Sequence, residues 1–232
     1  MDYRDRHVVV TGGTGALGIA VVGALLKTGA YCHVPFHIAA EADDFPLRGE
    51  PRVHLSGPVN LADEADVRRI YGEVPRLWAS IHLAGGFAAG GIADIDKVAL
   101  TRQLEMNFVS CFLCCRAAVQ ALREAGGGRI VNVAARPALE PRQGAGMSAY
   151  GASKAAVAAL TAALGEELAK EDILVNAVAP SVLDTPANRR AMPKAKHELW
   201  PKVEEVAAAI LFLASPENRV TRGAVLPVYG RS

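Results

Sequence analysis

The sequence predicts a single α/β domain in which one doubly wound parallel sheet of about seven strands is covered by helices on both faces. Short apolar stretches alternate with longer stretches of helical periodicity between residues 7 and 228. The apolar stretches are continuous, as is typical of strands buried on both faces of a parallel sheet. A glycine-rich turn directly after the first of them is the third observation. Together they predict the strand order 3-2-1-4-5-6-7 within one domain, residues 1–232.

Each element follows from the local pattern. We expect the first strand at residues 7–10 and a helix at residues 16–27, ended by Gly29. The other expected strands are short and apolar: residues 31–36, 52–55, 78–83, 129–133, 173–178 and 224–228. The other expected helices are residues 63–71, 101–124, 148–170 and 203–213. The stretch between residues 180 and 201 is rich in proline and basic residues, and it predicts a long substrate loop at about residues 181–200.

Composition excludes several classes of protein. Hydrophobic residues make up 51% and charged residues 21% of the chain, which fits a folded domain rather than a disordered one. The 25 Lys and Arg against 24 Asp and Glu give a net charge of +1, so charge suggests neither a nucleic-acid partner nor a membrane surface. No apolar stretch of about 18 residues predicts a membrane span, and the mixed charges of residues 1–6 do not resemble a signal peptide. We expect a cytoplasmic protein with a small-molecule substrate.

The cysteines offer an alternative role. Cys111 and Cys114 have the Cys-x-x-Cys spacing of redox and metal sites, but no second Cys or His pair stands at ligand spacing. Together with Cys115 they fall within a helical pattern, where buried cysteines pack as small apolar side chains. We therefore expect no metal site and interpret these cysteines as part of a helix interface.

The glycine-rich turn spans residues 11–18, between the first strand and the first helix. Glycines let the backbone turn tightly and approach a pyrophosphate, whose charge then sits at the helix N-terminus. A glycine motif alone is weak, but a strand before it and a helix after it are the context of a Rossmann-type dinucleotide site. The residues expected to bind the cofactor here are Gly12, Thr14, Gly15, Ala16, Leu17 and Gly18.

The end of the second strand bears on the choice of cofactor. An acidic side chain there would accept from the ribose hydroxyls of NAD, whereas a nearby arginine would pair with the 2′-phosphate of NADP. Phe36 and His37 occupy the position and satisfy neither rule, so NAD and NADP both stay open. After the third strand, Asn60 and Leu61 stand where we expect the adenine, whose polar edge an amide would suit.

Tyr150 and Lys154 form the expected catalytic pair. They begin a helix four residues apart, which places both on one face. We expect the ammonium to lower the pKa of the phenol by favouring the phenolate. A phenol so tuned can give or take a proton near neutral pH, as acid–base catalysis requires.

With these residues the sequence resembles the short-chain dehydrogenase/reductase family over essentially its whole length. The resemblance rests on the glycine turn, the Tyr150–Lys154 pair, Asn107, residues 83–86 and residues 176–180. Three positions depart from the family pattern: Ala16 replaces a glycine, Leu83 an asparagine and Ser181 a glycine.

The resemblance implies roles for the matching residues. Asn107 would support Lys154 through water, and Lys154 would also hold the nicotinamide ribose. Further cofactor contacts are implied for Ala84, Gly85, Gly86, Tyr150, Pro180, Val182 and Thr185. Because members of the family pair their long helices across subunits, the resemblance also implies a homodimer or homotetramer.

One catalytic position does not match the family. Its serine, which polarises the substrate carbonyl just after the fifth strand, is replaced here by Ala135. Residues 84–87 and 183–193 resemble segments of dihydropteridine reductase, a branch that lacks the same serine while keeping the tyrosine and lysine. This second resemblance implies a small conjugated hydride acceptor.

Three functions therefore stay open on the sequence. The leading hypothesis is an NAD(P)H-dependent reductase of a small conjugated acceptor, similar to dihydropteridine reductase. The second is a carbonyl or 3-oxoacyl reductase of the same family. The third is a catalytically silent NAD(P)-binding sensor, which the presence of Tyr150, Lys154 and Asn107 disfavours because a binding protein needs no acid.

Overall fold

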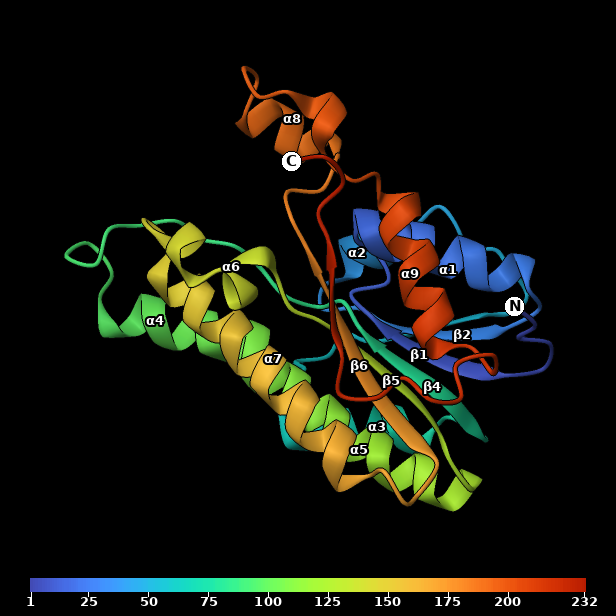
Figure 1. The fold of residues 1–232 in the computed structure, drawn as a ribbon. Helices are drawn as coiled ribbons and strands as arrows, with labels where there is room; N and C mark the ends of the chain where they lie inside the picture. Colours follow the sequence, from blue (N-terminus) through green and yellow to red (C-terminus); the bar gives the residue numbers. More distant parts are fainter.

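Seven strands form one parallel sheet in the computed structural model, which describes residues 1–232 (Figure 1). The order is β3-β2-β1-β4-β5-β6-β7, and every neighbouring pair is parallel, which confirms the predicted order. The strands are β1 His7–Thr11, β2 Tyr31–Pro35, β3 Val53–Ser56, β4 Leu77–His82, β5 Gly128–Val133, β6 Ile173–Pro180 and β7 Val225–Val228.

Helices cover both faces of this sheet. The longer ones are α1 Ala16–Lys27, α3 Glu64–Gly72, α4 Lys97–Leu104, α5 Ser110–Ala125, α7 Ser148–Glu167 and α9 Val203–Ala214. Three short helices lie in segments expected to be loops: α2 Ala39–Asp43, α6 Arg136–Leu139 and α8 Pro186–Ala191. The single helix expected at residues 101–124 is instead α4 and α5 joined by a π-helical turn, Glu105–Val109. No helix is both long and apolar enough to cross a membrane.

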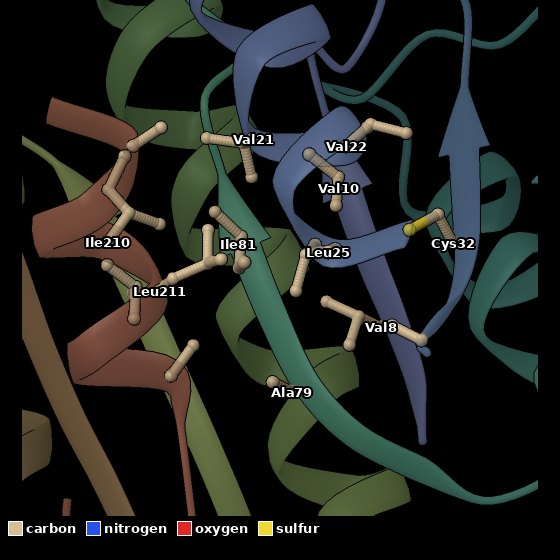
Figure 2. Packing of buried hydrophobic residues seen from close by; sticks show 14 of the residues in the cluster. Val8, Val10, Val21, Val22, Leu25, Cys32, Ala79, Ile81, Ile210 and Leu211 are labelled. Atoms are coloured by element: carbon tan, nitrogen blue, oxygen red, sulfur yellow. The ribbon is translucent and has the colours of Figure 1, made fainter. Parts of the chain in front are cut away.

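Two hydrophobic clusters fill the space between the sheet and the helices, one on each face of the sheet. Val8 and Val10 of β1 pack with α1 and α9 on one face (Figure 2), whereas Val9 packs with α3 and α5 on the other. In Figure 2, Ile210 and Leu211 of α9 point at β4 from beside α1. Because successive side chains of a strand enter opposite clusters, every position of β1 after His7 is buried. This is why the strands read as continuous apolar stretches.

The strand order places two turns side by side. The sheet is built outward in one direction from β1 and in the other from β4, and Thr11 is the register partner of His82 where these strands end. The glycine turn after Thr11 and the segment after His82 therefore leave the sheet at the same edge. Ligands of open α/β sheets bind in the crevice at such a switch point.

The expected substrate loop is partly helical. Thr185 caps α8 by accepting from the amide of Asn188 at 3.1 Å, and Pro186 begins the helix with a preset φ. Asp184 and Arg189 form a two-point ion pair of 2.6 and 2.8 Å across the cap. Figure 1 shows α8 projecting beyond the ends of the strands, next to the C-terminus. A six-residue helix carries too little periodicity to be seen in the sequence, so the expected loop did not include α8.

Candidate active site

The glycine turn packs against the segment that follows β4. Gly12 has φ +66°, and a Cβ there would lie 2.7 Å from the amide nitrogen of Ala84. A Cβ at Gly18 would overlap the carbonyl oxygen of Gly12, so the turn and α1 require glycine at both positions. Gly15 caps α1 without a side chain, and no acidic residue stands in the first turn. The first amides of this 12-residue helix, those of Ala16 and Leu17, have no side-chain cap. With the backbone of residues 11–18 they form a glycine cradle, which fits a pyrophosphate.

The expected adenosine residues lie in two loops that are bonded to each other. Phe36 donates its amide to Ser56 and accepts from Val59, each at 3.0 Å. Its ring packs over Gly57, where a Cβ would come within 2.8 Å of it. His37 contacts the carbonyl oxygen of Val59 through Nδ1 at 2.9 Å.

Asn60 and Leu61 follow in the second of these loops. The side-chain oxygen of Asn60 accepts from the backbone amide of Ala62 at 3.0 Å. The backbone amide of Asn60 donates to the Asp66 carboxylate at 2.8 Å. Leu61 packs against the hydrophobic cluster beneath α3. The structure thus brings Phe36, His37, Asn60 and Leu61 to the edge of the sheet where we expected them, with the Asn60 side chain engaged locally.

The expected catalytic pair, Tyr150 and Lys154, lies in the first turns of α7. Lys154 is only 6% exposed, and its Nζ donates to the carbonyl oxygen of Val133 at 2.9 Å. Burial lowers the pKa of Lys154 to about 8, an effect that Cys111 partly opposes. Tyr150 meets the ring of Phe87 edge to face, with 5.0 Å between centroids.

The expectation that Lys154 lowers the pKa of Tyr150 was wrong. Burial raises the pKa of Tyr150 to about 12, and Lys154 does not oppose it. The reason is geometric: the ammonium is bonded to Val133, and no hydrogen bond joins it to the phenol. At neutral pH the phenol is therefore protonated.

Asn107 connects the segment after β4 to the catalytic helix. Its Oδ1 accepts from the amide of Gly86 at 2.9 Å, and its Nδ2 donates to the Gly86 carbonyl at 3.0 Å and to Ser153 at 3.1 Å. Ser153 in turn donates to the carbonyl oxygen of Tyr150 at 2.7 Å. A Cβ at Gly85 would lie 2.6 Å from Asn107 and 3.4 Å from the Lys154 ammonium, so this close approach needs glycine. The role of Ser153 was not anticipated, although it stands next to Lys154 in sequence.

Asn107 sits in the π-helical turn that interrupts α4 and α5. Such single turns inside α-helices occur frequently at functional sites. The remaining expected cofactor residues are at the end of β6, where Pro180 is buried and Val182 is 37% exposed, and at Thr185, which is engaged in capping α8.

The position of the missing serine is an apolar wall. Ala135 is 5% exposed and precedes α6, and Ala134 donates to the Val178 carbonyl at 2.9 Å. Neither side chain offers a hydrogen bond to a substrate oxygen. The position where the resemblance predicts a serine hydroxyl thus provides none.

A second buried polar cluster, here called the His82 network, lies between β4, β5 and helices α3, α5 and α7. Asn132 Oδ1 accepts from His82 Nδ1 at 2.8 Å and from the thiols of Cys111 and Cys115 at 3.4 Å each. Asn132 Nδ2 donates to Thr161 at 2.9 Å. The network also contains Ser80, 2.8 Å from His82 Nε2, and Tyr71, 3.2 Å from it.

Every buried polar side chain of the protein has a hydrogen-bond partner, the His82 network included. The ligand atoms of His82, Cys111 and Cys115 lie within 4.8 Å of one another, and each is bonded to a neutral group. All four cysteines are free and buried, and the burial of Cys111, Cys114 and Cys115 in α5 confirms their expected place in a helix interface. The pair that converges is Cys111 and Cys115, one helical turn apart, rather than the Cys-x-x-Cys pair.

Comparison with known proteins agrees with this geometry. The family model described as short chain dehydrogenase matches residues 6–196. The chain is 33% identical to cis-4-hydroxycyclohexanecarboxylate dehydrogenase of Sinomonas cyclohexanicum over 98% of this chain and 96% of that one. It is 32% identical to 2,3-dihydro-2,3-dihydroxybenzoate dehydrogenase of Escherichia coli, with 82% of this chain and 74% of that one covered.

A solved structure shows the same fold. The short-chain type dehydrogenase/reductase from Mycobacterium ulcerans superimposes with a TM-score of 0.90 at 24% identity, covering 99% of this chain and 90% of that one. The strand order, the glycine turn and the family match leave one conclusion. This chain belongs to the short-chain dehydrogenase/reductase family of NAD(P)-dependent oxidoreductases.

Proposed function

We propose that the chain interconverts a small alcohol and the corresponding carbonyl compound, or an equivalent reduced and oxidised pair, with Tyr150 as the acid–base residue. The observation that carries this proposal is the pair of a half-buried Tyr150 and a buried Lys154, which Asn107 and Ser153 tie to the segment beside the glycine turn. A binding protein has no use for a buried ammonium placed next to a phenol, because burying the charge costs free energy.

The residues present fit a nicotinamide dinucleotide. The glycine cradle and the uncapped first turn of α1 would hold the pyrophosphate, and the loops after β2 and β3 would take the adenosine. Gly85, Gly86, Pro180 and Val182 would flank the nicotinamide. When bound, this group donates or accepts the hydride, and the residues described here supply orientation and the proton.

Tyr150 is set for the reductive direction. With a pKa of about 12 its phenol carries a proton at neutral pH, which it can give to a substrate oxygen or nitrogen that gains negative charge. The pKa of Lys154, about 8, is close to neutral pH, so this side chain can either hold or release its proton there. Moving its Nζ from Val133 toward the phenol would favour the phenolate and so support the reverse reaction.

Ring alcohols are the first candidate substrate class. The two named relatives act, by their names, on a hydroxycyclohexane carboxylate and a dihydroxylated dihydrobenzoate. Both are small rings that carry a carboxylate and a secondary hydroxyl group. We propose an alcohol of this kind, or its ketone, as the substrate to test first.

A conjugated acceptor similar to a quinonoid dihydropterin is the second candidate, and Ala135 favours it. In a plain ketone the negative charge gathers on one oxygen, where a second donor stabilises the transition state by about 3–4 kcal/mol. A conjugated system spreads that charge over several atoms and needs the donor less. The apolar wall at Ala135 therefore suits such an acceptor better than a simple ketone.

One experiment distinguishes these functions. Purified protein is mixed with NADH or NADPH and with each member of a panel: a 4-oxocyclohexanecarboxylate, an acyclic 3-oxo ester and a quinonoid dihydropterin. Loss of reduced-nicotinamide absorbance gives kcat/KM for each. Turnover of the ring ketone or the oxo ester above that of the dihydropterin supports the alcohol dehydrogenase, and the reverse supports the conjugated acceptor.

Ala135→Ser sharpens the comparison between the two substrate classes. If the missing donor matters, the added hydroxyl raises kcat/KM for the ketones and leaves the dihydropterin nearly unchanged. Dinucleotide binding without turnover of any compound would point to the silent sensor and contradict the proposal.

We also propose that the protein is a homodimer or homotetramer. Phe112 in the first turn of α5 is 44% exposed, and its ring centroid lies 6.2 Å from that of Phe108, so this end of the helix presents apolar side chains to solvent. Light scattering after size-exclusion chromatography measures the mass directly. A monomer at micromolar concentration would contradict this proposal.

A further inference from the structure

The loop after β2 contains a carboxylate that the end of the strand itself lacks. Phe36 and His37 stand where a dinucleotide enzyme reads the adenosine ribose, and neither is acidic or strongly basic. Four residues on, however, Glu41 of α2 turns back toward the strand. Its Oε2 accepts from the backbone amide of His37 at 2.9 Å. An acidic oxygen is therefore held at the carboxyl end of β2 by a residue outside the strand.

This placement is fixed from several sides. His37 is tied to the Val59 carbonyl by Nδ1 at 2.9 Å, and Phe36 bridges the loops after β2 and β3 through its amide and carbonyl. The amide of Glu41 donates to Ile38 at 3.0 Å, which starts the short helix at the required place. Ionised carboxylates only accept hydrogen bonds, and no protein donor occupies Oε1 of Glu41. That oxygen is free to accept from a ribose hydroxyl.

The charges of the neighbouring segments point the same way. Residues 28–47 contain three acidic side chains, Glu41, Asp43 and Asp44, and no Lys or Arg. The glycine turn at residues 11–18 and the loop at residues 57–63 contain no Lys or Arg either. A 2′-phosphate brought to this loop would carry a charge of almost −2 without a cationic partner in these segments. It would also meet an amide, that of His37, already bonded to a carboxylate.

We infer that Glu41 is the residue that makes this enzyme select NAD(H) over NADP(H), by accepting from the ribose and repelling a 2′-phosphate. The inference rests on the proposed dinucleotide-dependent activity, and it decides between two cofactors that both fit the glycine cradle. It assigns to a residue of α2 the role that the end of β2 leaves vacant.

Calorimetric titration of the full chain with NADH, NADPH, adenosine 5′-phosphate and adenosine 2′,5′-bisphosphate tests the inference without turnover. The wild-type protein should bind NADH at least about tenfold more tightly than NADPH, and the monophosphate more tightly than the bisphosphate. Glu41→Gln, which keeps the shape and removes the charge, should narrow the preference by about tenfold. Because the discrimination is partly electrostatic, added salt should weaken it in the wild type more than in Glu41→Gln.

Asp43→Asn and Asp44→Asn are the matched controls. Both change the net charge by the same amount on or next to the same helix, and neither carboxylate bonds to the end of β2. They should leave the preference within about twofold of the wild type, as expected for exposed charges without a specific contact. A thermal melt of each variant confirms that the fold is kept.

Three results would overturn the inference. One is tighter binding of NADPH than of NADH by the wild type. Another is an unchanged preference in Glu41→Gln, and the third is an equal shift in the control variants. Each of these leaves the proposed oxidoreductase intact, because a dinucleotide still binds. If neither dinucleotide binds, the proposed function fails and the inference fails with it.

Discussion

Two polar clusters lie between the sheet and the helices that cover one of its faces, and they differ in how completely their polar groups are hydrogen-bonded. The catalytic cluster of Tyr150, Lys154, Asn107 and Ser153 holds an ammonium whose pKa burial lowers to about 8. In the His82 network each polar side chain has a partner, and hydrogen bonding, chiefly to Cys115, lowers the pKa of Cys111 to about 5. In the catalytic cluster the Lys154 ammonium has one hydrogen bond and the Tyr150 hydroxyl has none, whereas every polar side chain of the His82 network is bonded within the core.

We interpret the first cluster as the one that serves catalysis and the His82 network as the one that stabilises the fold. Asparagine occurs at the centre of both: Asn132 gathers four side chains of the core, whereas Asn107 holds backbone atoms of Gly86 beside the reactive pair. Satisfied buried networks rigidify a core, and groups with displaced pKa values gather at active sites. We therefore expect substitutions in the two clusters to separate activity from stability.

The largest effect is expected for Tyr150→Phe. Removing the phenol should lower kcat by about 10²- to 10⁴-fold, as for loss of a general acid. Dinucleotide affinity and Tm should stay near wild type, because no protein group bonds to this hydroxyl. Tyr31→Phe, a partly exposed tyrosine far from the site, is the control. Wild-type turnover in Tyr150→Phe would show that another acid does the work.

Asn132→Ala should affect stability instead. The change removes the acceptor of His82 Nδ1 and of two thiols, and the donor to Thr161, from the buried core, so the free energy of unfolding should fall by about 2–4 kcal/mol. Denaturant titration measures it, and kcat per folded molecule should stay close to wild type. A loss of turnover without a loss of stability would show that the His82 network serves catalysis, which contradicts the division of roles between the two clusters.

Lys154→Met should abolish most activity and yet stabilise the protein. Below about pH 8 Lys154 is charged in both the folded and unfolded states, and its burial costs the folded state the full penalty. Between about pH 8 and 10.5 the unfolded state binds more protons, so the wild type regains stability as pH rises. At pH 7 we expect the free energy of unfolding of the variant to exceed that of the wild type by about 1–3 kcal/mol. This figure already subtracts the lost hydrogen bond to Val133.

This gain should shrink as the pH rises from about 8 and vanish above 10.5, where Lys154 of the wild type is neutral in both states. Denaturant melts at three pH values measure the trend. Lys170→Met at an exposed position is the control and should show no such pH dependence. A destabilised Lys154→Met at pH 7 would mean that the ammonium is fully compensated, and the contrast between the clusters would fall.

The smallest effect is expected for Tyr71→Phe. Its hydroxyl lies 2.6 Å from Ser80 and 3.2 Å from His82, which are themselves 2.8 Å apart and stay bonded to each other. Because no group loses its last partner, the cost should be only about 1 kcal/mol. Denaturant melts detect this size of change. A loss as large as that of Asn132→Ala would show that the network acts as one unit rather than around Asn132.

Local patterns in the sequence predicted the frame of the molecule. The strand order followed from continuous apolar stretches, because a parallel sheet buries both faces of each strand. The glycine turn and the Tyr150–Lys154 spacing were visible because both depend on contacts between residues near in sequence. Short helices such as α2 and α8 were missed, since five or six residues do not complete a periodic pattern.

The features that depend on tertiary packing could not be predicted. The π-helical turn at Glu105–Val109 fits Asn107 against Gly86, a segment about 20 residues earlier. The pKa of Tyr150 was expected to fall and is raised, because desolvation is set by what surrounds the ring, Phe87 included. Glu41 could not be connected to the cofactor without the fold, since it reads in sequence as one of several acidic residues on a polar segment.

Two of the buried cysteines, Cys32 and Cys114, let the rate of alkylation report how often the protein unfolds. Burial raises the pKa of Cys32 to about 12 and that of Cys114 well above its ordinary range, and an alkylating reagent attacks only an accessible thiolate. Labelling must then wait for the chain to open, so its rate follows the population of open molecules. Mass spectrometry of a timed alkylation could thus report how a bound dinucleotide slows opening, with no probe added to the chain.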